Sequence, residues 1–218
     1  MGRGVLEGAF LLLEEIIDTE ECGLSELAAR TGLPKATVHR LLDQLVQLGA
    51  VERGEGRYRM GARMFRFGTG WRSGADLRAA ALYPLRQLAA ALPGAAVSVA
   101  VPDRENTLVL GALRGETDEA LPLRAGLKYP AEGAWQVLFK AARDGDGVLY
   151  VQESTCAQEV AGISVVVRTR TGEVCGAVSA SVLDRRRLPA MVPAVRHAAD
   201  LVSGQLARIW RPSGPVTA

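Results

Sequence analysis

The segment from residue 24 to residue 45 constrains the fold more than any other part of the chain, because it predicts two short helices joined by a tight turn. Ala28 is small enough for the two helices to pack closely. Gly32 lies in the turn, where a positive φ costs little only for glycine. Val38 comes six residues later and is a branched apolar residue that holds the helices at a fixed angle. This spacing is typical of a helix-turn-helix.

Further elements surround this pair of helices. Residues 5–17 predict a helix with one apolar stripe, formed by Leu6, Phe10, Leu13 and Ile17. Pro34 stands at the first position of the second helix of the pair, which we expect to end at Gly49. Two short β runs follow at residues 51–53 and 57–60, around a glycine-rich turn, and predict a small hairpin. Together these elements form a winged helix.

Basic residues are concentrated in this part of the chain. Residues 1–27 carry a net charge of −6, whereas residues 28–74 contain nine basic and three acidic residues. The net charge of the whole chain is only +2, which excludes a uniformly basic surface. A basic block over the second helix and the hairpin favours contact with DNA phosphates. The alternative is a winged helix that binds another protein and whose helical pair is simply solvated.

A helical wheel separates the outward residues of the second helix from its apolar core. The core positions of the pair are Leu27, Val38, Leu41, Leu42 and Leu45. The residues expected to contact DNA from the second helix are Lys35, Ala36, Thr37, His39 and Arg40. In the hairpin, Arg57 and Arg59 are expected to reach phosphates or the minor groove.

The second half of the chain predicts an α+β domain. Residues 76–92 form an apolar helical face, and Pro84 within it is expected to kink or split the helix. Period-two patterns predict strands that include residues 97–101, 107–113, 163–169 and 174–182. One helix is expected over 133–142 and another near the C-terminus. Glycines at 68, 70 and 74 mark a joint, so we expect a DNA-binding domain over 1–70, a linker helix over 71–93 and an effector and oligomerisation domain over 94–218.

The predicted strand 174–182 has one small, polar face. Alternation places Cys175, Ala177, Ser179 and Ser181 on this face and larger apolar residues on the other. Such a face either lines a cavity, where hydroxyls orient a polar ligand, or packs against a helix. The sequence leaves both interpretations open.

The chain lacks the sequence features of a metal site, a catalytic site or a membrane span. Its two histidines, His39 and His197, lie far from other metal-ligand types at suitable spacing. Its three cysteines are widely spaced, as in a reduced cytoplasmic protein. No phosphate-binding or nucleophile motif occurs, and no apolar run approaches the roughly 18 residues of a membrane span. We therefore expect a cytoplasmic protein that is not an enzyme and uses no cofactor.

Four runs of sequence resemble one known family: Leu24–Ala28, Gly32–Leu42, Gly49–Val51 and Arg57–Gly61. They are similar to the N-terminal domain of the IclR-type bacterial transcriptional regulators, and a weaker similarity extends the match over about residues 5–210. The resemblance implies a winged helix-turn-helix joined to a GAF-like effector-binding domain with an antiparallel sheet. It also implies assembly into a homodimer or tetramer.

The chain departs from the family pattern at several positions. Ala36 replaces a serine of the recognition helix, and Trp135 and Val137 stand where small residues are usual beside the effector pocket. The chain is also shorter after Ala142. The residues expected at the pocket are Glu132, Ala134, Trp135, Cys175, Ser179 and Ser181.

These observations predict a homo-oligomeric repressor that binds a double-stranded DNA operator and responds to a small polar metabolite. The alternative is an effector-independent regulator with a vestigial pocket, controlled by oligomerisation or a protein partner. Trp135, Val137 and the shortened segment favour that alternative. An enzyme or carrier built on the second domain lacks a recognisable nucleophile and base.

Overall fold

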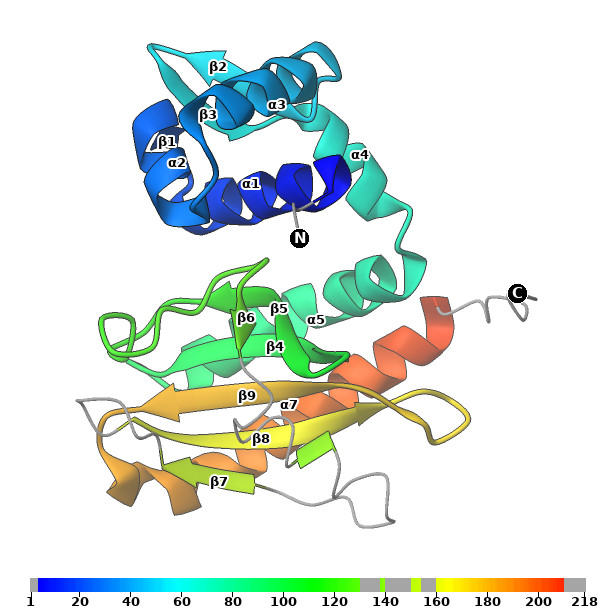
Figure 1. Cartoon of the computed structure of the whole chain (residues 1–218). Helices are drawn as coiled ribbons and strands as arrows, with labels where there is room; N and C mark the ends of the chain where they lie inside the picture. The colour runs from blue at the N-terminus through cyan, green and yellow to red at the C-terminus, as the bar shows by residue number, and fades with distance from the viewer. Residues whose placement is uncertain (1–3, 130–137, 140–149, 154–159, 210–218) are drawn as a thin grey trace. The chain divides into compact units, whose positions relative to one another are not determined.

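A computed structural model describes residues 4–129, 138–139, 150–153 and 160–209 (Figure 1). The chain divides into two compact units, Met1–Trp71 and Arg72–Ala218. The predicted pocket residues Glu132, Ala134 and Trp135 lie outside the described residues, as does most of the helix expected over 133–142.

The first unit contains four helices and a small antiparallel sheet. The helices are α1 (Val5–Thr19), α2 (Leu24–Thr31), α3 (Lys35–Gln47) and α4 (Ala62–Thr69). The strands are β1 (Cys22–Gly23), β2 (Val51–Gly54) and β3 (Arg57–Met60), in the order β1-β3-β2. Glu55 and Gly56 both have positive φ in the two-residue loop between β2 and β3, as a tight hairpin turn requires. The predicted helix-turn-helix and hairpin are confirmed.

The turn between α2 and α3 has the conformation that its glycine predicts. Gly32 has a φ of 67° and donates its backbone N–H to the carbonyl of Ala28, which ends α2. Val38 and Leu27 are completely buried between the helices. The core of this unit joins α1, α2, α3 and the hairpin around Leu12, Ile16, Leu42, Val51 and Tyr58.

Helix α1 buries a different face from its predicted stripe. Leu13 is buried, but Leu6 is 76% exposed, Phe10 63% and Ile17 39%. A Cβ on Gly8 would lie 3.1 Å from a methyl carbon of Leu41, so the missing side chain allows α1 to approach α3 closely on this side. That close approach turns the Gly8 side of the helix inward and leaves most of the stripe on the surface.

The second unit is built on a six-stranded antiparallel sheet (Figure 1). Its strands are β4 (Ala96–Asp103), β5 (Asn106–Leu113), β6 (Lys128–Tyr129), β7 (Tyr150–Glu153), β8 (Ala161–Arg168) and β9 (Val174–Val182). They lie in the order β6-β5-β4-β9-β8-β7. The helices are α5 (Arg72–Ala91), the 3-10 turn η1 (Arg185–Arg187) and α7 (Leu188–Ile209). The predicted α+β class is confirmed.

Helices α5 and α7 pack on one face of this sheet and bury its main core. The core includes Leu77 and Leu88 of α5, Val195 and Val202 of α7, and alternate residues of the central strands. Helix α5 continues as one element from Arg72 to Ala91 with Pro84 inside it, so the proline does not split the helix. The helix expected as a linker is therefore part of the core of the second unit.

The opposite face of the sheet carries smaller and more polar side chains. Ser98 and Ala100 of β4 point away from α5 and α7, since their neighbours Val97, Val99 and Val101 belong to the main core. Small groups of apolar residues cover parts of this face, including Leu123 near β5 and Phe139 near β9. This face brings together the hydroxyl groups described below.

Candidate functional site

Helix α3 exposes the residues that were predicted to contact DNA. Lys35, Ala36, His39 and Arg40 are exposed and Thr37 is half-buried, whereas the opposite side of the helix is buried against α1 and α2. Within the described part of the chain, Lys35 and Arg40 form no hydrogen bond or ion pair. Both side chains are therefore available to an anionic surface such as a DNA backbone or a guanine edge.

His39 is held by an acidic neighbour one helical turn away. Its Nδ1 lies 3.0 Å from an Oδ2 of Asp43, and both side chains are about half exposed. This contact engages one ring nitrogen, which orients the imidazole and leaves Nε2 for a donor or acceptor on a base. Asp43 thus positions a residue that the sequence predicts as a DNA contact.

The two wing arginines form ion pairs with acidic residues of the same unit. Arg57 donates to the carbonyl oxygen of Glu21 at 2.8 Å and lies 3.6 Å from its carboxylate. Arg59 lies 3.0 Å from the carboxylate of Glu52, directly across the hairpin. Exposed pairs of this kind contribute only about 0.2–1 kcal/mol, so a phosphate can replace the carboxylate at little cost.

Two other arginines of the basic block stabilise the fold. Arg63 donates to the carbonyl oxygen of Leu48 at 2.7 Å, just beyond the end of α3, and stacks over the ring of Phe67. Arg30 lies 2.6 Å from the carboxylate of Glu15, which joins α2 to α1. Fewer basic side chains of residues 28–74 are therefore available to DNA than the net charge of that stretch indicates.

A row of serines crosses the central strands of the second unit. Ser179 of β9 lies level with Ser98 of β4 and with Ser164 of β8 in the strand register. The hydroxyl oxygens of Ser164 and Ser179 are 2.7 Å apart, and Ser181 lies 3.3 Å from the hydroxyl of Thr117. We call Ser98, Ser164 and Ser179 the serine row. Alternation along residues 174–182 predicted Ser179 and Ser181, but it could not predict the hydroxyls that other strands bring to them.

Ser98 and Thr107 each bury a hydroxyl that has no hydrogen-bond partner among the described residues. Ser98 is completely buried and Thr107 is 1% exposed. A buried polar atom without a partner costs about 1–3 kcal/mol, and native structures contain few of them. These hydroxyls are therefore suited to receive a polar ligand on this face of the sheet.

Cys175 does not share the face of Ser179 and Ser181, so its predicted place in the pocket is wrong. The register between β8 and β9 shifts at Val167 and Arg168, and Cys175 packs against the main core on the helix side. An extra residue in one strand reverses the alternation beyond it. Burial raises the pKa of the Cys175 thiol to about 11, so it is protonated and unreactive at neutral pH.

No cluster of His, Cys, Asp or Glu suitable for a metal ion occurs among the residues that the structure describes. In the same part of the chain, no helix is long and apolar enough to cross a membrane.

Comparison with known proteins identifies the first unit. Residues 5–55 match the IclR helix-turn-helix domain. The chain carries an IclR helix-turn-helix domain and resembles the IclR-type transcriptional regulators. It is therefore a DNA-binding regulator and not an enzyme. The exposed side of α3 is the surface that the second helix of a helix-turn-helix offers to DNA.

Two transcriptional regulators are similar to a longer part of the chain than the helix-turn-helix domain. The glycerol operon regulatory protein of Streptomyces coelicolor is 28% identical over 212 residues, which cover 87% of this chain and 83% of that protein. The glycerol operon regulatory protein of Streptomyces griseus is 31% identical over 135 residues, which cover 60% of this chain and 53% of that protein.

Several solved structures share the fold of this chain. An IclR homologue from Microbacterium hydrocarbonoxydans, solved with 4-hydroxybenzoate, has a TM-score of 0.76 and 21% identity, covering 94% of this chain and all of that one. HmgR of Pseudomonas aeruginosa has a TM-score of 0.69 and 19% identity, covering 91% of this chain and 96% of that one. The winged helix followed by an α+β domain is thus a shared architecture.

Proposed function

We propose that the protein is a homo-oligomeric repressor that binds a double-stranded operator and changes its affinity for DNA when a small polar effector binds the second unit. The observation that carries the DNA-binding half of this proposal is the exposed side of α3, where Lys35 and Arg40 have no partner among the described residues. We assign base contacts to Arg40 and His39, and phosphate contacts to Lys35 and the wing arginines.

Assembly into an even-numbered oligomer is supported by the apolar surface of the first unit. Leu6 and Phe10 of α1 are more than half exposed, and so are Phe65 and Phe67 of α4. Monomeric proteins seldom expose this many large apolar side chains on one small unit, and such surfaces usually contact another chain. A two-fold dimer would present two recognition helices to half-sites about one helical turn of DNA apart.

The serine row supports the effector half of the proposal. It offers a polar ligand the unpartnered hydroxyl of Ser98 beside the hydrogen-bonded hydroxyls of Ser164 and Ser179. Hydroxyl groups of this kind suit a small hydroxylated or carboxylated molecule. The relatives named above regulate a glycerol operon, and one similar structure holds 4-hydroxybenzoate, so glycerol and hydroxybenzoates are the first compounds to test.

In this proposal each part of the chain has a separate role. Residues 1–70 bind DNA, residues 94–218 bind the effector and residues 71–93 connect them. The effector acts as a population shift: it binds one conformation of the regulator more tightly and so changes the fraction that is competent for DNA. This coupling must appear as a ligand-dependent change in operator affinity.

Sequencing the genomic DNA fragments retained by the purified protein tests the function directly. We expect enrichment of a few intergenic fragments with two similar half-sites, and weaker binding to them when the effector is present. Retention of random fragments in proportion to their length would contradict sequence-specific binding. Unchanged affinity across the tested metabolites would favour the effector-independent alternative.

A further inference from the structure

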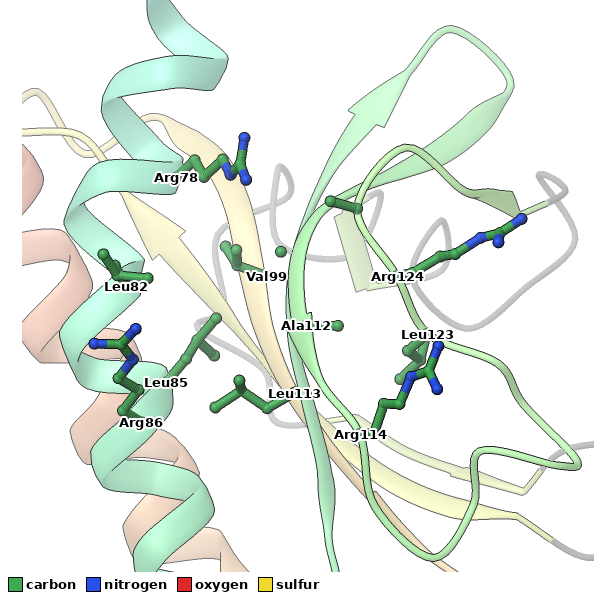
Figure 2. A pocket seen from close by; sticks show the side chains of 12 residues that line it. Arg78, Leu82, Leu85, Arg86, Val99, Ala112, Leu113, Arg114, Leu123 and Arg124 are labelled. Atoms are coloured by element: carbon green, nitrogen blue, oxygen red, sulfur yellow. The ribbon is translucent and has the colours of Figure 1, made fainter. Parts of the chain in front are cut away.

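A pocket lies between helix α5 and strand β5 of the second unit (Figure 2). Its volume is about 250 Å³, below the roughly 300–1,000 Å³ of sites for drug-sized ligands, so it suits a small molecule. The apolar part of its wall is formed by Leu85, Val99, Leu113 and Leu123. It opens beside α5 and reaches around β5 to Leu123, which packs on the opposite face of the sheet, whereas the serine row lies on the central strands β4, β8 and β9.

The charged part of the wall consists only of arginines. Arg78 and Arg86 come from α5, Arg114 follows β5, and Arg124 comes from the loop before β6, while no residue that lines the pocket is acidic. Figure 2 shows Arg78 extending from α5 toward β5 and Arg124 directed outward. Arg114 lies 3.5 Å from the carboxylate of Asp118, so it is partly neutralised.

Arg78 and Arg86 form no hydrogen bond or ion pair with any described residue, and both are exposed. They stand eight residues apart on α5, which places them two turns apart on the same side of the helix. Leu82 lies between them, is 57% exposed and also borders the pocket. Two cations separated by an apolar side chain repel each other and attract an anion that carries an apolar body.

Strand β5 contributes backbone to the same pocket. Strand β6 pairs with β5 only at Thr107 and Leu108, and the loop that precedes β6 bonds to Val109. Gly111–Leu113 therefore borders the pocket at the edge of the described sheet. Gly111 has no side chain to cover the strand there. Edge backbone of this kind can donate N–H groups to a carboxylate or phosphate.

We propose that this pocket binds a small organic anion, a carboxylate or phosphate ester with a compact apolar body, and that it is a second ligand site separate from the serine row. Arg78 and Arg86 bind the anionic group, and Leu85, Leu113 and Leu123 contact the apolar body. The regulatory part of this proposal rests on the proposed function. Helix α5 begins directly after the first unit, so a ligand bound against α5 contacts the helix that leads from the DNA-binding unit into the core of the second unit. Such a ligand favours the conformations of the regulator that bind it more tightly.

Isothermal titration of the full-length protein with phenyl phosphate, benzoate and hexanoate tests the site. We expect at least one of these probes to bind with a dissociation constant below about 1 mM. Inorganic phosphate tests the contribution of the charge alone, and benzyl alcohol tests that of the apolar body alone. Both should bind more weakly than the organic anion that binds best. Absence of binding by all three organic anions would overturn the proposal, as would equal affinity for inorganic phosphate and phenyl phosphate.

Matched variants locate the binding. Arg78→Gln and Arg86→Gln should each weaken the bound probe by roughly ten- to a hundredfold, because each removes a charged hydrogen bond. Arg196→Gln changes an exposed arginine of α7 that does not line the pocket and should leave the affinity unchanged. Loss of binding in Ser179→Ala with full binding in the two α5 variants would place the anion on the serine row and overturn the assignment.

Operator binding without ligand separates the two proposals. If ligand-free protein selects specific DNA but no probe binds, the pocket assignment fails and the proposed function stands. If probes bind and the α5 variants lose them, but no DNA is selected, the pocket stands and the regulatory role fails. If both hold, the bound probe should change operator affinity in the parent protein and in Arg196→Gln, and not in Arg78→Gln.

Discussion

Ser164 of β8 and Ser179 of β9 share a hydrogen bond, with their hydroxyl oxygens 2.7 Å apart. Ser98 of β4 lies level with Ser179 in the strand register, and its hydroxyl has no partner in the described structure. One hydroxyl of this row therefore has no hydrogen-bond partner among the residues that the structure describes. A buried site that keeps an unpaired hydroxyl is less stable than it could be, and functional sites often retain this kind of defect.

Replacing Ser98 with alanine should stabilise the ligand-free protein by up to about 1 kcal/mol, because the substitution removes a buried hydroxyl that has no partner. Ser179→Ala should lower the free energy of unfolding by about 1–3 kcal/mol, because it leaves the hydroxyl of Ser164 unpaired. Urea unfolding of the two variants measures both effects. Equal destabilisation by the two substitutions would mean that Ser98 has a hydrogen-bond partner in solution.

The recognition helix leads to a second prediction. Arg40→Ala and His39→Ala should each weaken binding to a selected operator by about 1–3 kcal/mol, because each removes a contact to a base edge. Both side chains are exposed on α3, so the far-ultraviolet circular dichroism spectrum and the melting temperature should not change. Gel-shift titration at constant salt measures the loss, with Arg196→Ala on α7 as the control. Unchanged operator affinity in both variants would place the recognition surface elsewhere.

The wing arginines should affect all DNA sequences alike. Arg57→Ala and Arg59→Ala should each lower the slope of log affinity against log salt by about 1, because each removes one phosphate contact. Glu52→Gln should have the opposite effect at low salt and strengthen binding a few-fold, since it frees Arg59 from its 3.0 Å ion pair. Fluorescence anisotropy with operator and random duplexes measures these effects. Weaker binding in Glu52→Gln would show that the ion pair holds Arg59 in position for DNA.

The free energy of unfolding should depend on pH in the alkaline range because Cys175 is buried. Burial raises the pKa of this thiol from 9.0 to about 11, so between these values the unfolded chain ionises the thiol while the folded protein keeps it protonated. The free energy of unfolding should therefore fall from pH 9 to pH 11, by up to about 2–3 kcal/mol from this group. Cys175→Ala removes this component, and urea unfolding at several pH values compares it with the parent protein. A stability difference between the two proteins that is independent of pH would contradict the raised pKa.

The helix-turn-helix could be predicted because its determinants are local. Gly32 must adopt a positive φ and Val38 must lie between two helices, and both requirements follow from residues within one short segment. The exposed positions of α3 follow from the same periodicity. The apolar stripe of α1 is different, since the choice of its buried face depends on how closely Gly8 approaches Leu41 on another helix.

The candidate effector site depends on strand register, which local sequence patterns do not determine. Alternation along one strand places Ser179 and Ser181 on one face, yet a bulge opposite β8 moves Cys175 to the other. Ser98 and Ser164 join Ser179 only because β4 and β8 pair with β9 in one register, and these strands are far apart in the sequence. The pocket between α5 and β5 likewise depends on which strand edge lies beside the helix. The amino-acid sequence by itself determined the helices, the exposed side of α3 and the alternating faces of the unbulged stretches of strand, because these depend on neighbours within a few residues. Tertiary structure alone decided which helix face is buried and which hydroxyls and arginines meet, because strand register and helix packing are set by contacts across the whole unit.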